Sequence, residues 1–244
     1  MPKRYDATDE ETESLCRILR AFSDAGFIND VVLIGSWCLY FYADIFEGFI
    51  PSVRTTDIDF YVPNSKTANA KNLSLQLKAM NYDHFQDTIT NKSRFVSPGG
   101  FEIEFLARLN RDGLSCVRLG SSGVFAESLS YLDLYNTNYL EIEKWGLCFK
   151  IASPSSFVIQ KIMIQNRRGA KALKDAQAIK YVSSFIFASR KSETEFMNIY
   201  LSLPKNMEKT GERIFIETRI RLRFRLKPVK KENKVIRNAS IPLA

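Results

Sequence analysis

The sequence predicts an α/β (α+β) fold in which a mixed β-sheet is flanked by helices and followed by a C-terminal helical region. Two observations support this. Amphipathic helical patterns alternate with short apolar runs along the first hundred residues, and the turn sequence Ser-Pro-Gly-Gly at 97–100 joins two of these runs as a hairpin. The chain has 244 residues, of which 45% are hydrophobic, and is therefore long enough to bury a substantial core.

The first half of the chain contains the clearest periodic patterns. A capping box beginning at Thr8 precedes apolar residues at helical spacing, and β-branched runs follow. In chain order the expected elements are a helix over 9–25, a strand over 31–34, a helix from Ser36 to just before Gly48, a strand over 57–62, a helix over 70–80, and hairpin strands over 94–96 and 101–106.

The second half divides into a weakly patterned stretch and a helical one. Candidate strands lie at 132–134, 139–143 and 147–151, and Ser153-Pro154 then predicts a helix to 165, because proline is favoured in the first helical turn. Further helices are expected over 170–187 and 193–201. We predict a core domain at 1–152, a C-terminal helical region at 153–204 and a basic, partly disordered extension at 205–244.

Charge and cysteine content narrow the class of protein. The extension 205–244 carries 12 Lys and Arg against 4 Glu, which accounts for the whole net charge of +8. Such a tail is compatible with contact to RNA and equally with an ordinary solubilising terminus. The four cysteines are widely spaced, which argues against disulfides and zinc clusters, and no apolar stretch is long enough for a membrane span. We therefore expect a cytoplasmic protein without membrane contact.

Two acids within a predicted strand, Asp57 and Asp59, are the first sign of chemistry. Residues i and i+2 of a strand project from the same face, so both carboxylates point together. No basic residue between Thr55 and Val62 neutralises them. Carboxylates without His or Cys are ligands that suit Mg²⁺ or Mn²⁺, and Mg²⁺ is commonly held by one or two carboxylates together with substrate phosphates.

A second acidic pair occurs in the later strand Phe101–Leu106. Glu102 and Glu104 alternate with apolar residues and share a face. If this strand neighbours the first, one of them supplies a third metal ligand. Glu104 is the preferred ligand because its apolar-acid-apolar context repeats that of Asp59, and Glu102 is held in reserve.

Gly35 and Ser36 follow the strand 31–34 directly. Glycine allows a backbone to approach a ligand closely, and a serine at the start of a helix offers a hydroxyl and free N–H groups to an anion. The expected arrangement is a triphosphate held at this turn with its metal-bound oxygens facing the acids.

These motifs in this order resemble the nucleotidyltransferase superfamily of the DNA polymerase beta type. The carrying residues are Gly35-Ser36, Arg54-Thr55-Thr56-Asp57-Ile58-Asp59 and Glu102-Ile103-Glu104. The form is closest to stand-alone prokaryotic nucleotidyltransferase proteins related to those of abortive-infection and toxin–antitoxin systems. The resemblance covers about residues 31–187 and implies the nucleotidyltransferase fold.

The resemblance also implies a reaction. A nucleoside monophosphate would pass from an NTP to an acceptor, such as RNA, tRNA or a protein hydroxyl, with release of pyrophosphate. Asp57, Asp59 and Glu104 would be catalytic and bind two Mg²⁺ or Mn²⁺ ions, and Gly35 and Ser36 would hold the NTP phosphates. A two-metal mechanism needs no histidine base, which agrees with the single His of this chain.

Four basic residues are candidate nucleotide contacts, each with a simpler alternative. Lys161 would reach a phosphate or base, or would extend from a core helix to solvent. Arg168 and Lys174 would contact nucleotide or belong to a solvated, salt-bridged helix face. Arg54 would orient the acidic loop or face solvent.

Two other functions stay open at the level of sequence. One is a catalytically inactive relative that binds nucleotide or RNA. The other is a toxin–antitoxin component that is active only with a cognate antitoxin or other partner protein.

Overall fold

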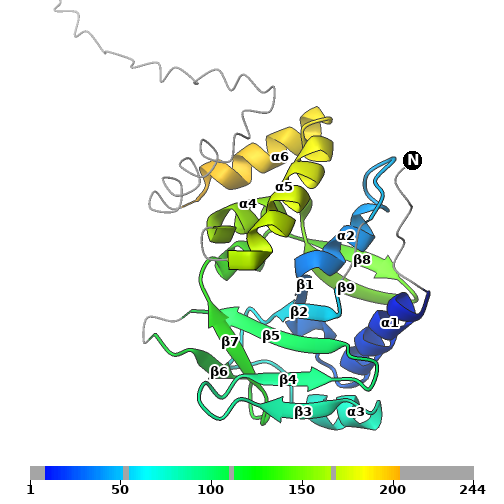
Figure 1. The fold of residues 1–244 in the computed structure, drawn as a ribbon, viewed down its shortest axis with the longest axis vertical. Helices are drawn as coiled ribbons and strands as arrows, with labels where there is room; N and C mark the ends of the chain where they lie inside the picture. The colour runs from blue at the N-terminus through cyan, green and yellow to red at the C-terminus, as the bar shows by residue number, and fades with distance from the viewer. Residues whose placement is uncertain (1–8, 52–54, 110–112, 166–168, 204–244) are drawn as a thin grey trace, which may run out of the picture.

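The computed structural model describes residues 9–51, 55–109, 113–165 and 169–203. It confirms a mixed α/β fold with a mixed sheet flanked by helices (Figure 1). The elements are α1 (Asp9–Asp24), β1 (Val32–Ile34), α2 (Cys38–Tyr42), β2 (Asp57–Tyr61), α3 (Leu73–Ala79), β3 (Asp83–Gln86), β4 (Ser93–Val96), β5 (Glu102–Arg108), β6 (Cys116–Arg118), β7 (Phe125–Leu129), β8 (Tyr139–Lys144), β9 (Leu147–Ala152), α4 (Pro154–Ile164), α5 (Ala172–Ile186) and α6 (Arg190–Leu201).

The strands form one sheet in the order β3-β4-β5-β2-β1-β9-β8, and β7 adds to β5 with β6 beside it. β2 lies antiparallel to β1 and parallel to β5, so the two acid-bearing strands are direct neighbours. The predicted hairpin is confirmed, since β4 and β5 pair antiparallel across the turn at 97–100. The sequence signals at Asp57–Asp59 and Glu102–Glu104 therefore come together at the centre of the sheet.

One face of the sheet is covered by α1, whose apolar stripe predicted from the sequence is fully buried. Phe22 of α1 packs against Phe60 of β2 with ring centroids 4.7 Å apart, and it also contacts Phe105 of β5. The alternation of strand side chains places Ile58 and Phe60 in this core. It consequently turns Asp57 and Asp59 to the opposite face.

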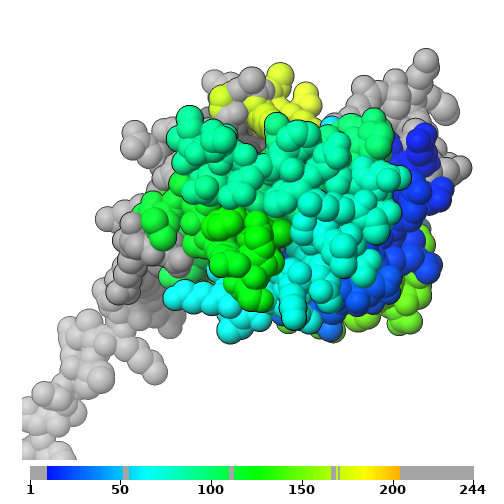
Figure 2. Space-filling model, turned by 90° about the horizontal axis from the view of Figure 1, so that it is seen from below, coloured from blue at the N-terminus to red at the C-terminus, as the bar shows by residue number. Residues whose placement is uncertain are grey.

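The helices α4, α5 and α6 gather at one end of the molecule, at the top of Figure 1, away from α3 and β3. Viewed from below, the surface is formed largely by the segments that include α3, β3 and β4, with α1 in dark blue at one side (Figure 2). The start of α4 agrees with the prediction, because Ser153 caps it by accepting a hydrogen bond from the backbone N–H of Ser156 (3.2 Å) with Pro154 next in the chain.

Several boundaries differ from the sequence predictions. The expected strand at 132–134 is wrong, because Leu132–Asn136 is a 3₁₀ turn. Tyr131 enters it with a left-handed backbone (φ 68°), which ends any extended conformation, and Leu132 and Tyr135 are buried at the three-residue spacing of such a turn. The helix expected from Ser36 is restricted to Cys38–Tyr42 and follows a 3₁₀ turn at Gly35–Trp37.

Two further features bear on the class of protein. All four cysteines are free, although Cys38 alone among them is fully buried. None of the helices in the described ranges is long and apolar enough to cross a membrane. The predictions for 205–244, and for Arg54 and Arg168, concern residues outside the described ranges.

Candidate active site

The turn after β1 lies directly against the acids of β2. Ile34 pairs with Asp59 across the antiparallel ladder, and the chain then reverses at Gly35 with a left-handed backbone (φ +75°). A Cβ atom at Gly35 would collide with Oδ2 of Asp59. Glycine is therefore required here both by backbone conformation and by the closeness of the carboxylate.

The third acid is placed by strand pairing. In the parallel register of β2 and β5, Asp57 is opposite Glu102 and Asp59 is opposite Glu104. Paired residues of adjacent strands project from the same face, so all four carboxylates share the face that α1 leaves uncovered. The expectation that a second acidic strand neighbours the first is therefore confirmed.

Burial raises the pKa values of two of these acids, Asp59 and Glu104. Burial raises the pKa of Asp59 to about 6, and the charges of Glu104 and Asp57 add to this effect, whereas Lys161 and Lys171 oppose it. Burial also raises the pKa of Glu104, while the ammonium of Lys92 acts in the opposite direction. A divalent cation at this position would relieve the repulsion, so the oxygen-only donor set fits Mg²⁺ or Mn²⁺.

Within the described ranges, cationic side chains accompany Asp57, Glu102 and Glu104. Lys171, just before α5, places Nζ 3.5 Å from Oδ2 of Asp57. Lys92 lies 2.6 Å from Oε1 of Glu104. Arg94 is 3.3 Å from Oε1 of Glu102. Across the described ranges, no three His, Cys, Asp or Glu side chains are already grouped closely enough to hold a metal ion.

Lys161 has a partner within the helical region. Its Nζ is 2.6 Å from Oδ1 of Asp175, linking α4 to α5, and both side chains are almost completely buried. It also lies over the ring of Phe157 at 5.1 Å. Lys161 is thus neither snorkelling to solvent nor open to it, although its charge is close enough to act on Asp59.

Lys171 and Lys174 present further positive charge from the start of α5. The Lys171 side chain is 62% exposed. Burial lowers the pKa of Lys174, and the nearby charges of Lys161 and Lys171 lower it further. Lys171 therefore contacts Asp57 directly, and Lys174 is near enough to feel the charges of Lys161, Lys171 and Asp57.

Sequence reasoning missed three residues of this site, namely Lys171, Lys92 and Glu127. Neither Lys171 nor Lys92 belongs to a motif in the sequence, and Lys92 lies in a polar loop. Glu127 belongs to β7, a short strand that was not predicted, and its Oε2 is 2.8 Å from Nζ of Lys92. Only the three-dimensional pairing of strands could have found the last two.

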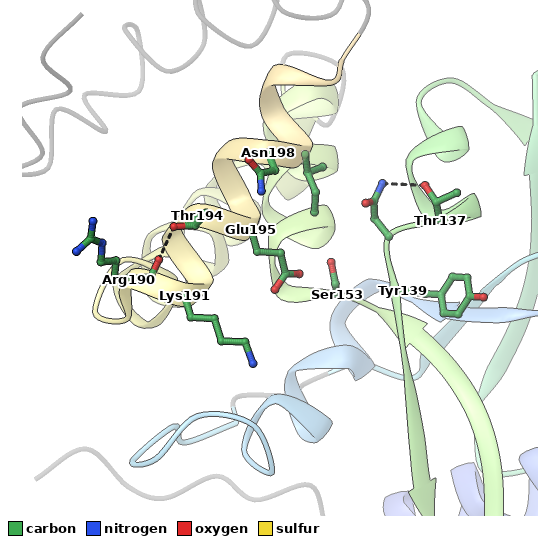
Figure 3. Close-up of a pocket in the computed structure, with 10 residues that line it drawn as sticks. Thr137, Tyr139, Ser153, Arg190, Lys191, Thr194, Glu195 and Asn198 are labelled. Carbon is green, nitrogen blue, oxygen red and sulfur yellow. Dashed lines mark hydrogen bonds between the residues drawn. The ribbon is translucent and has the colours of Figure 1, made fainter. Parts of the chain in front are cut away.

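Two cavities lie near the helical region and the sheet edge. One, of about 670 Å³, lies between α6 and the segment around the start of β8 (Figure 3). Its polar lining includes Asn138, Ser153, Arg190, Lys191 and Glu195, and none of the acids of β2 or β5. The other, of about 360 Å³, lies beside the third acid and is lined by Phe85, Gln86, Asp87, Lys92, Arg94, Glu102 and Glu104.

Comparison with known proteins identifies the family of this chain. The nucleotidyltransferase family matches residues 13–201, which is most of the chain. The chain therefore belongs to the nucleotidyltransferase family, and this membership supports nucleotidyl transfer as its type of reaction. None of the curated protein sequences matches it.

Solved structures with a related fold share little sequence. An antigenic nucleotidyltransferase-like protein from Paracoccidioides brasiliensis is 16% identical, with a TM-score of 0.45 over 84% of this chain and 93% of that one. ANT(2'')-Ia, in complex with adenylyl-2''-tobramycin, is 10% identical, with a TM-score of 0.49 over 78% and 97%. The Thermotoga maritima CCA-adding enzyme, complexed with tRNA, is 14% identical, with a TM-score of 0.30 over 89% and 52%.

Proposed function

We propose that the chain is a Mg²⁺- or Mn²⁺-dependent enzyme that transfers a nucleoside monophosphate from an NTP to an acceptor hydroxyl and releases pyrophosphate. The observation that carries the proposal is the placement of Asp57, Asp59 and Glu104 side by side on paired strands, with the Gly35 backbone against Asp59. Family membership supports the same type of reaction.

In this proposal Asp57 and Asp59 are the principal metal ligands and Glu104 is the third, with Glu102 as the reserve. When bound, the ions supply charge stabilisation to the attacking and leaving oxygens. Glu104 is preferred over Glu102 because it lies opposite Asp59 in the ladder and acts most strongly, among the neighbouring charges, on the pKa of Asp59.

The phosphates of the NTP are proposed to lie between the turn at Gly35-Ser36 and the lysines of the helical region. The turn offers backbone N–H groups and a serine hydroxyl. Among the described residues, Lys171 is a cation suited to this role, since it contacts Asp57 at 3.5 Å and is exposed enough to turn to a phosphate. Lys174 adds charge at the same place, whereas Lys161 acts from its buried pair with Asp175.

The reaction balances without a histidine base. The acceptor hydroxyl releases its proton to solvent water, and its oxygen forms a bond to the α-phosphorus. The bond from that phosphorus to the bridging oxygen breaks, and pyrophosphate leaves with the electron pair. Glu104 is the carboxylate placed to orient that hydroxyl, because it lines the cavity of about 360 Å³ at the outer side of the acids. Contact with RNA through 205–244, and an antitoxin partner, remain predictions from the sequence.

The proposal is tested by incubating the protein with each common NTP, radiolabelled at the α-phosphorus, together with Mg²⁺ and either total RNA, protein or small-molecule extract. We expect label to become attached to one acceptor class in the wild type, and to be lost in Asp57→Asn and Asp59→Asn. Asp83→Asn, the same change on the exposed strand β3, serves as the matched control. Transfer that persists in both site variants would overturn the assignment of the acids.

A further inference from the structure

The carboxylate proposed as the third metal ligand already has a cation partner, supplied by the chain itself. Nζ of Lys92 lies 2.6 Å from Oε1 of Glu104 and 2.8 Å from Oε2 of Glu127. The side chains of Lys92, Glu104 and Glu127 are 25%, 22% and 35% exposed, so the bridge is partly shielded from water. One ammonium thus joins two carboxylates at the edge of the proposed active site.

The sheet explains why one lysine reaches both acids. β5, which carries Glu104, pairs with β4 up to Glu104 and further along with β7, whose Glu127 lies in register with Leu106. Lys92 directly precedes β4, and the backbone N–H of Phe125 in β7 donates a hydrogen bond to Oγ of the next residue, Ser93 (3.0 Å), so Lys92 lies where β4 and β7 meet and reaches both Glu104 and Glu127. Arg94, two residues further, instead contacts Glu102 at 3.3 Å and is 52% exposed. The two cations of this edge therefore have different partners.

An ammonium group and a divalent cation compete for the same carboxylate, because both are attracted to the negative carboxylate oxygens and the two cations repel each other. We infer that Lys92 and the metal ion bind Glu104 in turn. The ammonium of Lys92 pairs with Glu104 when no metal ion is bound, and it pairs with Glu127 alone when Glu104 binds the metal ion. This inference rests on the proposed function.

Glu127 lowers the cost of separating Lys92 from Glu104 when the metal ion binds. Releasing a partly buried ammonium without a partner is costly, because the lost ion pair is not replaced by full hydration. Glu127 already contacts Lys92, so the lysine keeps one carboxylate when it leaves the other. Lys92 is accordingly a positioning residue: it acts on the metal site through Glu104 and has no direct part in the chemistry.

The test is the affinity for Mn²⁺ alone, measured from the free ion by electron paramagnetic resonance. We expect Lys92→Met to bind Mn²⁺ roughly three- to tenfold more tightly than the wild type, the range set by a partly exposed ion pair. Arg94→Met, which removes the same charge from the same edge, is the matched control and is expected to change the affinity less than about twofold. Lys92→Gln repeats the test in a variant that keeps a polar side chain.

Glu127→Gln completes the cycle. In the wild-type background it should weaken Mn²⁺ binding, since Lys92 loses its alternative partner, and in the Lys92→Met background its effect should be much smaller. Any one of three results would overturn the inference. Glu127→Gln could change the Mn²⁺ affinity equally in the two backgrounds, Lys92→Met and Arg94→Met could raise that affinity equally, or neither Lys92 variant could raise it. Those results leave the proposed function intact if Asp57→Asn abolishes binding, whereas absence of Mn²⁺ binding in every protein would overturn both.

Discussion

Replacement of Asp59 by asparagine is expected to stabilise the metal-free protein while abolishing its activity. Asp59 is partly buried and faces Glu104 and Asp57, and its pKa is raised from 3.8 to about 6. The folded protein therefore holds the proton of Asp59 more tightly than the unfolded chain does. As a consequence, wild-type stability falls as the pH rises from about 4 to about 6, and the loss persists at higher pH.

The size of the effect follows from that change. A rise from 3.8 to about 6 corresponds to at most about 3 kcal/mol at pH 8. Residual solvent contact and the altered hydrogen bonds of the amide reduce this figure, so we expect Asp59→Asn to gain about 1–3 kcal/mol at pH 8. For a domain of this size each kcal/mol raises the midpoint of thermal unfolding by about 2–4 °C.

The assay is urea or thermal unfolding in EDTA at pH 8 and at pH 4. The gain of Asp59→Asn should be present at pH 8 and nearly absent at pH 4, because the wild-type carboxyl is then protonated as well. Excess Mg²⁺ should stabilise the wild type more than the variant. The exposed Asp83→Asn controls for loss of any carboxylate and should stay within about 0.5 kcal/mol. A variant that is less stable than the wild type at pH 8 would refute the reasoning.

Three further substitutions test neighbouring parts of the site. Gly35→Ala should lose activity and should lower the free energy of unfolding in urea by about 2 kcal/mol more than Gly48→Ala does. Both glycines have a left-handed backbone, but only Gly35 faces a carboxylate, so equal losses would contradict the proposed collision. Lys161→Met should lower the free energy of unfolding by about 1–3 kcal/mol, because the buried Asp175 loses this one partner, and Asp175→Leu in the same chain should restore part of it; an unchanged free energy of unfolding would exclude a structural role. Lys171→Met should keep the free energy of unfolding within about 0.5 kcal/mol of the wild-type value but weaken NTP binding about tenfold, as measured by calorimetry. Unchanged NTP binding would remove Lys171 from the proposed phosphate site.

The sequence was informative wherever one element carried its own signal. The strand with Asp57 and Asp59, the hairpin turn at 97–100 and the capped start of α4 each combine a local pattern with a distinctive residue type. The sequence also singled out Gly35 for close approach of its backbone, whereas its left-handed conformation and its closeness to Asp59 are seen only in the structure. These predictions depend on few neighbours, so local rules were sufficient.

The remaining features depend on contacts between distant segments. β3 is an exposed edge strand of mostly polar residues, and β7 is short, so neither shows a strong period-two pattern. Lys161 was the one charge in an apolar helix, but its burial against Asp175 required the packing of α4 on α5. The cation partners of the acids, Lys171 and Lys92, come from loops whose direction is decided by tertiary structure.

The central claim is that Asp57 and Asp59 support transfer of a nucleoside monophosphate. It is tested most directly by comparing NTP labelled at the α-phosphorus with NTP labelled at the γ-phosphorus. Wild type and Asp57→Asn are each incubated with Mg²⁺ and with the acceptor fraction that the wild type labels. The account predicts that only the α-label becomes attached to acceptor, that pyrophosphate appears in equal amount, and that the variant does neither. Attachment of the γ-label, or α-label transfer that survives in Asp57→Asn, would contradict it.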